Sequence, residues 1–160
     1  MREIMMNLIE QLKTHEGFRD DYYQCTADKR TIGFGRNVDD NPFSPKELNM
    51  LCRDEFINEP MTEDEAEILL VNDVKAIHKA IYDRAHLGRL NLARQAVCVN
   101  MAFNMGVNGF FCFKNMLKAI ELGDFEQAAI EMSDSVWHKR SQVGMRSNDL
   151  ILQMATGEWQ

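Results

Sequence analysis

The segment THEGFRDDYYQCTADKRTIGFGRN, Thr14 to Asn37, decides the local fold of the first part of the chain. Apolar residues before it recur at the spacing of one helix face, so a helix should end near Glu16. Within the segment, two runs of strand-favouring residues flank the polar residues 26–30, which predicts a β-hairpin with a longer loop. A helix end that holds an acid over a hairpin can form one wall of a cleft.

The composition allows an ordinary globular protein. The chain has 160 residues, of which 45% are hydrophobic, so it can bury a core without disulfide bonds. Its 18 basic and 25 acidic side chains give a net charge of −7, which argues against a globally basic nucleic-acid binder. Asn7, Glu10 and Gln11 interrupt the N-terminal apolar run, so we expect no signal peptide and no transmembrane segment.

The four cysteines carry no sign of a disulfide scaffold or a metal site. Cys25, Cys52, Cys98 and Cys112 form no CxxC pair and no Cys/His cluster with ligand spacing. We expect reduced thiols, with Cys52, Cys98 and Cys112 packed as small buried side chains. The four histidines also lack ligand spacing, and neither a metal nor another cofactor is expected.

Capping residues mark two helices after the hairpin. The pair Ser44–Pro45 suits the N-cap and first position of a short helix that reaches Cys52. Thr62 and Glu65 can form a capping box, which opens a helical pattern that continues to about Tyr82. This second helix is therefore expected to be long.

The second half of the chain reads as helical throughout. Asn91 starts the segment 92–105, whose apolar residues lie nearly all round the helix and so predict a central position. Gly123 ends a helix and Asp124 caps the next one. The other predicted helices cover residues 115–122, 125–132 and 145–155.

This order of elements predicts an α+β, mainly helical fold in a single domain, 1–160. A lobe at about 14–61 would hold the hairpin, and the long helix at about 62–82 would connect it to the next lobe. Residues from about 83 to 160 would form a helical lobe. The N-terminal helix, residues 1–13, would join this helical lobe.

Three residues of the opening segment have a characteristic spacing: Glu16, eight intervening residues, Cys25, five more, and Thr31. With the strand TIGFG at 31–35, this pattern resembles the phage lysozymes, or endolysins, of glycoside hydrolase family 24, whose middle position is Asp or Cys. Segments 100–106, 113–115 and 137–159 resemble later parts of the same family. The resemblance implies a lysozyme-like two-lobed fold, with a small β-hairpin sheet in the N-terminal lobe and a helical C-terminal lobe.

The resemblance also implies the chemistry. Breaking a β-1,4 bond between amino sugars needs a proton on the leaving oxygen, and Glu16 is the expected acid. Cys25 leaves three alternatives open, because a thiol is a base only when its pKa is lowered. It acts as a thiolate base or nucleophile, or it helps to place a water that Thr31 hydrogen-bonds, or a nearby aspartate supplies the charge. The candidate aspartates are Asp20, Asp21 and Asp28.

Further site residues follow from the same resemblance. Gly35 would let the saccharide approach the hairpin backbone, and Arg146 resembles the arginine that faces the acid in relatives. Arg36 stands where an enzyme of the family has His, so an ion pair built on that His is not carried over. The expected substrate contacts of the helical lobe are Phe103, Asn104 and Phe113.

The leading hypothesis is an endolysin muramidase, which hydrolyses the β-1,4 bond between N-acetylmuramic acid and N-acetylglucosamine in peptidoglycan for host cell lysis. Its partners would be glycan strands and a holin-type membrane permeabiliser, which releases a monomeric enzyme from the host cytoplasm to the cell wall. One alternative is a lytic transglycosylase, which needs an acid but no second carboxylate and leaves 1,6-anhydromuramyl ends. The other is a non-catalytic wall-binding protein.

Overall fold

The computed structural model describes residues 2–25, 28–54, 56, 59–139 and 144–160. These residues form seven α-helices, a short 3-10 helix and one three-stranded antiparallel sheet, which confirms the α+β, mainly helical fold class. The chain divides into two compact units, Met1–Asp73 and Val74–Gln160, here called the first and second units. The division falls within a helix, and the lobe limits expected at about residues 61 and 83 stay predictions.

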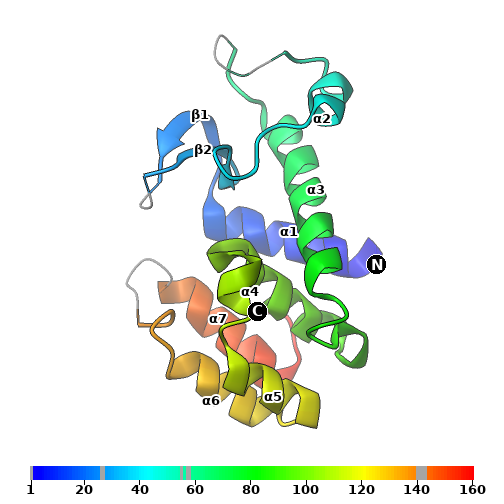
Figure 1. Cartoon of the computed structure of the whole chain (residues 1–160), viewed down its shortest axis with the longest axis vertical. Coiled ribbons are helices and arrows are strands. Elements are labelled where there is room, and N and C mark those ends of the chain that lie inside the picture. Colours follow the sequence, from blue (N-terminus) through cyan, green and yellow to red (C-terminus); the bar gives the residue numbers. More distant parts are fainter. Residues whose placement is uncertain (1, 26–27, 55, 57–58, 140–143) are drawn as a thin grey trace. The chain divides into compact units, whose positions relative to one another are not determined.

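The first unit combines helices with the sheet (Figure 1). The middle strand of the sheet is β2 (Arg30–Gly33), and both of its neighbours run antiparallel to it. The predicted hairpin is therefore present, with one strand more than expected. The elements are α1 (Arg2–Glu16), β1 (Arg19–Gln24), β2 (Arg30–Gly33), β3 (Arg36–Asn37), α2 (Pro45–Met50) and the start of α3 (Glu63–Ile81).

The third strand exists because the chain turns sharply after β2. Gly33 and Gly35 have φ angles of 66° and 80°, a region that only glycine adopts readily. Phe34 lies in the turn between them rather than in a strand, although the sequence pattern extended the strand to it. The turn returns the chain, so that Arg36 pairs with Ile32 and β3 forms. Thr26 and Ala27, in the predicted hairpin loop, lie outside the described residues.

The two predicted N-caps of the first unit are confirmed. At α3, Thr62 Oγ1 accepts the Glu65 N–H at 3.3 Å, and the Glu65 carboxylate accepts the Thr62 N–H at 2.8 Å. Ser44 caps α2 in the same reciprocal way, with Pro45 in the first turn. Helix α2 ends at Met50, before the predicted limit, because Cys52 has a left-handed φ of 53°.

The second unit is all helical. Helix α7 (Gly144–Thr156) packs against α4 (Leu92–Phe110) and α6 (Phe125–Ser133), and α6 packs against α5 (Lys114–Leu122). The predicted caps are confirmed, since Asn91 accepts the Arg94 N–H at 3.0 Å and Asp124 accepts the Gln127 N–H at 3.0 Å. The elements are the end of α3, η1 (Leu87–Arg89), α4 (Leu92–Phe110), α5 (Lys114–Leu122), α6 (Phe125–Ser133) and α7 (Gly144–Thr156).

Helix α4 lies at the centre of the second unit, as its apolar pattern predicts. Residues 96–102 of this helix are all buried. The helix runs beyond the predicted end at Met105, but Gly106 interrupts it with a non-helical φ of 78° and ψ of 156°. The predicted limits of α5, α6 and α7 each agree with the structure within one residue.

The cysteine prediction is correct for one of the three expected buried side chains. Cys98 is buried within α4, but Cys52 and Cys112 are exposed. Both exposed cysteines lie two positions after the last residue of a helix, where the amphipathic pattern no longer determines which side of the chain faces the core. Cys112 Sγ donates to the Asn108 carbonyl at 3.4 Å.

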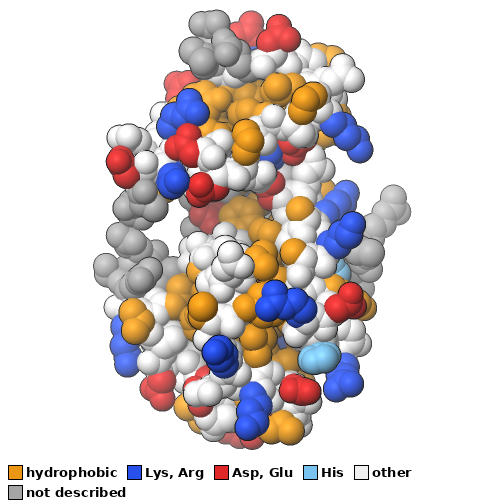
Figure 2. Space-filling view, in the orientation of Figure 1, with side chains coloured by type: hydrophobic (Ala, Val, Ile, Leu, Met, Phe, Trp, Pro, Cys, Tyr) orange, Lys and Arg blue, Asp and Glu red, His pale blue; other side chains and the backbone are white. Residues whose placement is uncertain are grey.

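Two surface features bear on partners. On the face shown in Figure 2, acidic and basic side chains of the described residues are interspersed, so the net charge of −7 is not gathered into one acidic surface there. Within the described ranges, no single helix has the length and apolar composition needed to cross a membrane. Only α4 and α5 taken together pass that test, and they are bent by 114° relative to each other.

Candidate active site

Glu16 is the last residue of α1, and its carboxyl group lies over the turn between β2 and β3. Gly17, with a φ of 69°, donates its N–H to the Lys13 carbonyl at 3.0 Å, and this glycine ends the helix. A Cβ atom on Gly35 would lie 2.9 Å from Glu16 Oε2 and 3.2 Å from Glu16 Cδ. A side chain at position 35 would therefore crowd this half-buried carboxyl group, which would have to shift.

Cys25 and Thr31 are joined through one backbone carbonyl group. Cys25 directly follows β1, and its N–H donates to the Lys29 carbonyl at 3.0 Å. Thr31 lies on β2 and donates its hydroxyl proton to the same carbonyl at 3.1 Å. Thr31 is 3% exposed and Cys25 is half-buried. The hairpin therefore brings the second and third members of the spaced pattern together.

Tyr23 lies within electrostatic range of two of these residues. Burial raises the pKa of the Tyr23 phenol, the charges of Glu16 and Cys25 raise it further, and Arg19 opposes them. The Arg19 guanidinium carbon lies 5.8 Å from the centre of the Tyr23 ring. The first unit thus gathers Glu16, Cys25 and Tyr23 near one another, while the candidate aspartates Asp20, Asp21 and Asp28 are exposed.

A buried ion-pair network holds the strand that follows Gly35. Arg36 is 6% exposed, and its Nη1 lies 2.8 Å from Glu47 Oε1 and 3.3 Å from Asp73 Oδ1. Its other N–H groups donate to the Asn41 and Pro42 carbonyls, each at 3.1 Å, and to Glu47 Oε2 at 3.1 Å. The network joins β3 to α2 and α3 within the first unit. The resemblance to the family did not predict an ion pair at Arg36.

The two acids of this network respond differently to their surroundings. Burial acts to raise the pKa of Glu47, but hydrogen bonds from Arg36 and Ser44 outweigh it and lower this pKa from 4.5 to about 2. Burial raises the pKa of Asp73, with the positive charge of Arg36 opposing it. Glu47 is therefore the firmly ionised partner of Arg36.

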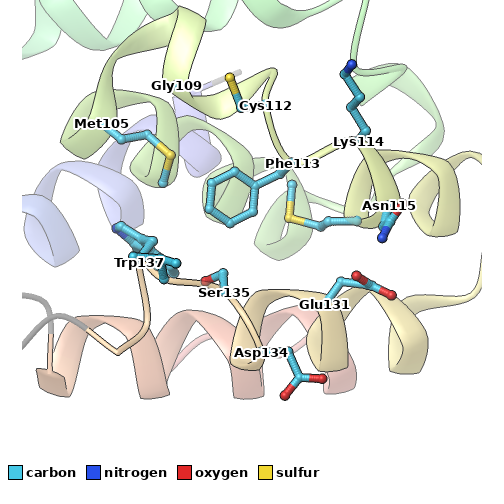
Figure 3. Close-up of a pocket in the computed structure, with 12 residues that line it drawn as sticks. Met105, Gly109, Cys112, Phe113, Lys114, Asn115, Glu131, Asp134, Ser135 and Trp137 are labelled. Carbon is cyan, nitrogen blue, oxygen red and sulfur yellow. The ribbon is translucent and has the colours of Figure 1, made fainter.

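One of the site residues expected in the second unit, Phe113, lies in the wall of a pocket of about 670 Å³ (Figure 3). Phe113 lines this pocket beside Trp137, with the two rings edge to face and their centres 6.3 Å apart. Asn104, on α4, accepts a hydrogen bond from Trp137 Nε1 at 2.9 Å. Lys114, Glu131 and Asp134 add charged groups to the pocket wall.

Two other expected residues of the second unit lie apart from this lining. Phe103 is half-buried on α4 and is not among the described residues that line the pocket. Arg146, in the first turn of α7, is only 7% exposed. An arginine is rarely buried to this extent without a specific role for its charge.

Among the described residues, no group of three or more His, Cys, Asp or Glu side chains is arranged to hold a metal ion. The site offers several polar side chains. Those of the first unit supply a carboxyl group, a thiol, a hydroxyl group and a phenol within one hairpin and the helix end beside it.

Sequence reasoning missed three of these features. Tyr23 counted only as a strand-favouring residue, although it stands two positions before Cys25 and so on the same side of an extended chain. The partners of Arg36 come from 11 and 37 positions away, and no local pattern links them. Trp137 was part of the C-terminal segment that resembles the family, and only the structure shows that its ring lies beside Phe113.

The chain is similar in sequence to a known protein family and to several known proteins. Residues 13–151 match the family described as phage lysozyme. The chain is 31% identical to a probable T4-type lysozyme 1 of Dictyostelium discoideum, over 96% of both chains. It is 25% identical to an endolysin of Acyrthosiphon pisum secondary endosymbiont phage 1, over 85% of this chain and 80% of that protein.

A further relative is much longer. The pre-baseplate central spike protein Gp5 of Enterobacteria phage T4 is 31% identical over 85% of this chain, and the match spans 26% of that protein.

Proposed function

Because this chain belongs to the phage lysozyme family and is a lysozyme-like peptidoglycan hydrolase, we propose that it cleaves the β-1,4 bond between N-acetylmuramic acid and N-acetylglucosamine. The observation that carries this proposal is the carboxyl group of Glu16, which lies against Gly35 in the unit that also joins Cys25 to Thr31. An acid beside a small hairpin with a second polar pair suits the cleavage of a glycosidic bond.

In the proposed reaction, Glu16 is the general acid. Its proton goes to the glycosidic oxygen as the bond from that oxygen to the anomeric carbon breaks, and the bonding electron pair stays with the leaving oxygen. A water oxygen forms the new bond to the anomeric carbon, and the proton that this water loses goes to Cys25 as a thiolate. Thr31 holds the water. The products are a reducing N-acetylmuramic acid end and a free hydroxyl group on N-acetylglucosamine.

We assign substrate contacts to both units. The absence of a side chain at Gly35 leaves the hairpin backbone open to a saccharide. In the second unit, the rings of Phe113 and Trp137 offer apolar faces, and a pocket of about 670 Å³ falls within the range of roughly 300–1,000 Å³ for ligand sites. Asn104 and Phe103 are further proposed contacts of the second unit, and we assign the buried Arg146 of this unit a supporting role.

The proposed setting is host cell lysis at the end of a phage infection. A monomeric enzyme made in the host cytoplasm would reach the wall once a holin-type partner has permeabilised the membrane. The endolysin relative supports this setting, because the match covers 80% of that protein.

One observation favours a second candidate function. Cys25 stands where a hydrolase of this kind can carry a second carboxylate, and a lytic transglycosylase needs only the acid. In that reaction the 6-hydroxyl group of the muramic acid attacks its own anomeric carbon, and no water is added. Cys25 would then be an ordinary packed thiol.

The proposal predicts distinct results for two substitutions at Cys25. In a turbidity assay on permeabilised Gram-negative cells, the wild type should clear the suspension. Cys25→Ser should lose about a hundredfold in rate, because a hydroxyl group is a much weaker base than a thiolate, whereas Cys25→Asp should retain clearing.

Two other results would favour the transglycosylase or the wall-binding protein over the hydrolase. Full activity in Cys25→Ser would show that Cys25 is not the base and would favour the transglycosylase. Failure of the wild type to clear cells, with the same result for Glu16→Gln, would indicate a non-catalytic wall-binding protein.

A further inference from the structure

Tyr23 shares a face of the sheet with Thr31. The two residues are direct partners across β1 and β2, and residues opposite each other in an antiparallel pair point to the same side. Cys25 follows two positions later along the chain, where an extended backbone returns to the same side. Tyr22 occupies the alternate position, and its ring centre lies 6.0 Å from the Arg30 guanidinium carbon.

The surroundings of Tyr23 keep its hydroxyl group protonated. The phenol is half-buried, and negative charge on Glu16 or on Cys25 disfavours ionisation of the phenol. A neutral phenol can donate one hydrogen bond. Tyr23 therefore supplies a hydrogen-bond donor near Glu16 and Cys25, whose ionised groups can only accept hydrogen bonds.

The hydroxyl group of Thr31 is already committed as a donor. Its proton points to the Lys29 carbonyl at 3.1 Å, so towards a water molecule Thr31 can act only as an acceptor. A water between Thr31 and a Cys25 thiolate would then donate both of its protons. Of its two lone pairs, one attacks the anomeric carbon, and the other needs a donor to fix the orientation of the water.

We propose that the Tyr23 hydroxyl group supplies this donor and so orients the attacking water together with Thr31 and Cys25. This inference rests on the proposed function, because it assigns Tyr23 a part in the same hydrolytic step. It makes Tyr23 a further catalytic residue, in contact with the reacting water through its hydroxyl group. The ring itself is not needed for this role beyond holding the hydroxyl group in place.

The test compares Tyr23→Phe with Tyr22→Phe. Each change removes one hydroxyl group from a neighbouring half-buried tyrosine, and only Tyr23 lies on the face of Thr31. With solubilised glycan strands as substrate, Tyr23→Phe should lower kcat roughly tenfold and leave KM and Tm unchanged, as expected for one hydrogen bond made in the transition state. Tyr22→Phe should retain the wild-type kcat.

A coupling measurement separates orientation of the water from packing. If Tyr23 and Thr31 hold the same water, the double variant Tyr23→Phe/Thr31→Ala should lose less than the product of the two separate losses. Equal kcat for Tyr23→Phe and Tyr22→Phe would overturn the inference, and so would a rise in KM with kcat unchanged. An inactive wild type would instead contradict the proposed function.

Discussion

Gly35→Ala is expected to lower kcat/KM on peptidoglycan by at least about a hundredfold, as the loss of a correctly placed acid does. The added methyl carbon would lie 2.9 Å from Glu16 Oε2, closer than side-chain Cβ atoms approach such an oxygen, and 3.2 Å from its Cδ. The carboxyl group of Glu16 would have to shift from its place over the turn. The measurement is the initial rate on solubilised glycan strands, together with Tm.

Gly123→Ala is the matched control for this substitution. Gly123 has a φ of 76°, close to the 80° of Gly35, but a Cβ on Gly123 would meet no atom within 4 Å. Both variants should lose roughly 1–2 kcal/mol of stability, because a side chain is strained at these angles. Only Gly35→Ala should lose activity. Equal activity in the two variants would contradict the assignment of Glu16 as the acid held by this turn.

Arg36→Met is expected to have the largest effect on stability, a loss of about 3–5 kcal/mol in the free energy of unfolding. The change leaves the Glu47 and Asp73 carboxyl groups, with side-chain exposures of 11% and 12%, without their common cation. Urea unfolding followed by circular dichroism measures the loss. Arg30→Met is the control, because the Arg30 side chain is 63% exposed and water screens its pair with Asp39, so this pair should contribute little to stability.

The same network makes the stability depend on pH. The pKa of Glu47 lies at about 2 in the folded protein against 4.5 for a free side chain, so its stabilising effect is complete above pH 4.5. This effect is lost as the pH falls from 4.5 through 2. In Arg36→Met, the free energy of unfolding should decrease less over this pH range. An unchanged acid dependence in Arg36→Met would contradict the pairing of Arg36 with Glu47.

The helices could be predicted closely because their signals are local. Thr62 and Asp124 each hydrogen-bond an N–H group three positions away, so a short window of sequence contains both partners. The strand β3 has only two residues and depends on the turn at Gly33 and Gly35 rather than on a hydrophobic pattern. A strand of this length has no periodicity to detect.

The candidate site was predictable in part. The spacing of Glu16, Cys25 and Thr31 is visible in the sequence, and the Lys29 carbonyl that joins the last two follows from the hairpin. The roles of Tyr23 and Arg36 depend on strand register and on partners far along the chain. Residue type and spacing alone do not contain that information, because they do not fix which side chains meet.

The chemical identity of the ends that the enzyme makes tests directly whether Glu16 drives hydrolysis at N-acetylmuramic acid. Purified peptidoglycan is digested with the wild type and with Glu16→Gln in ¹⁸O-labelled water, and the fragments are analysed by mass spectrometry. We expect reducing N-acetylmuramic acid ends that carry one ¹⁸O atom with the wild type, and no new ends with Glu16→Gln. Unlabelled 1,6-anhydromuramyl ends, or new reducing N-acetylglucosamine ends, would contradict this expectation.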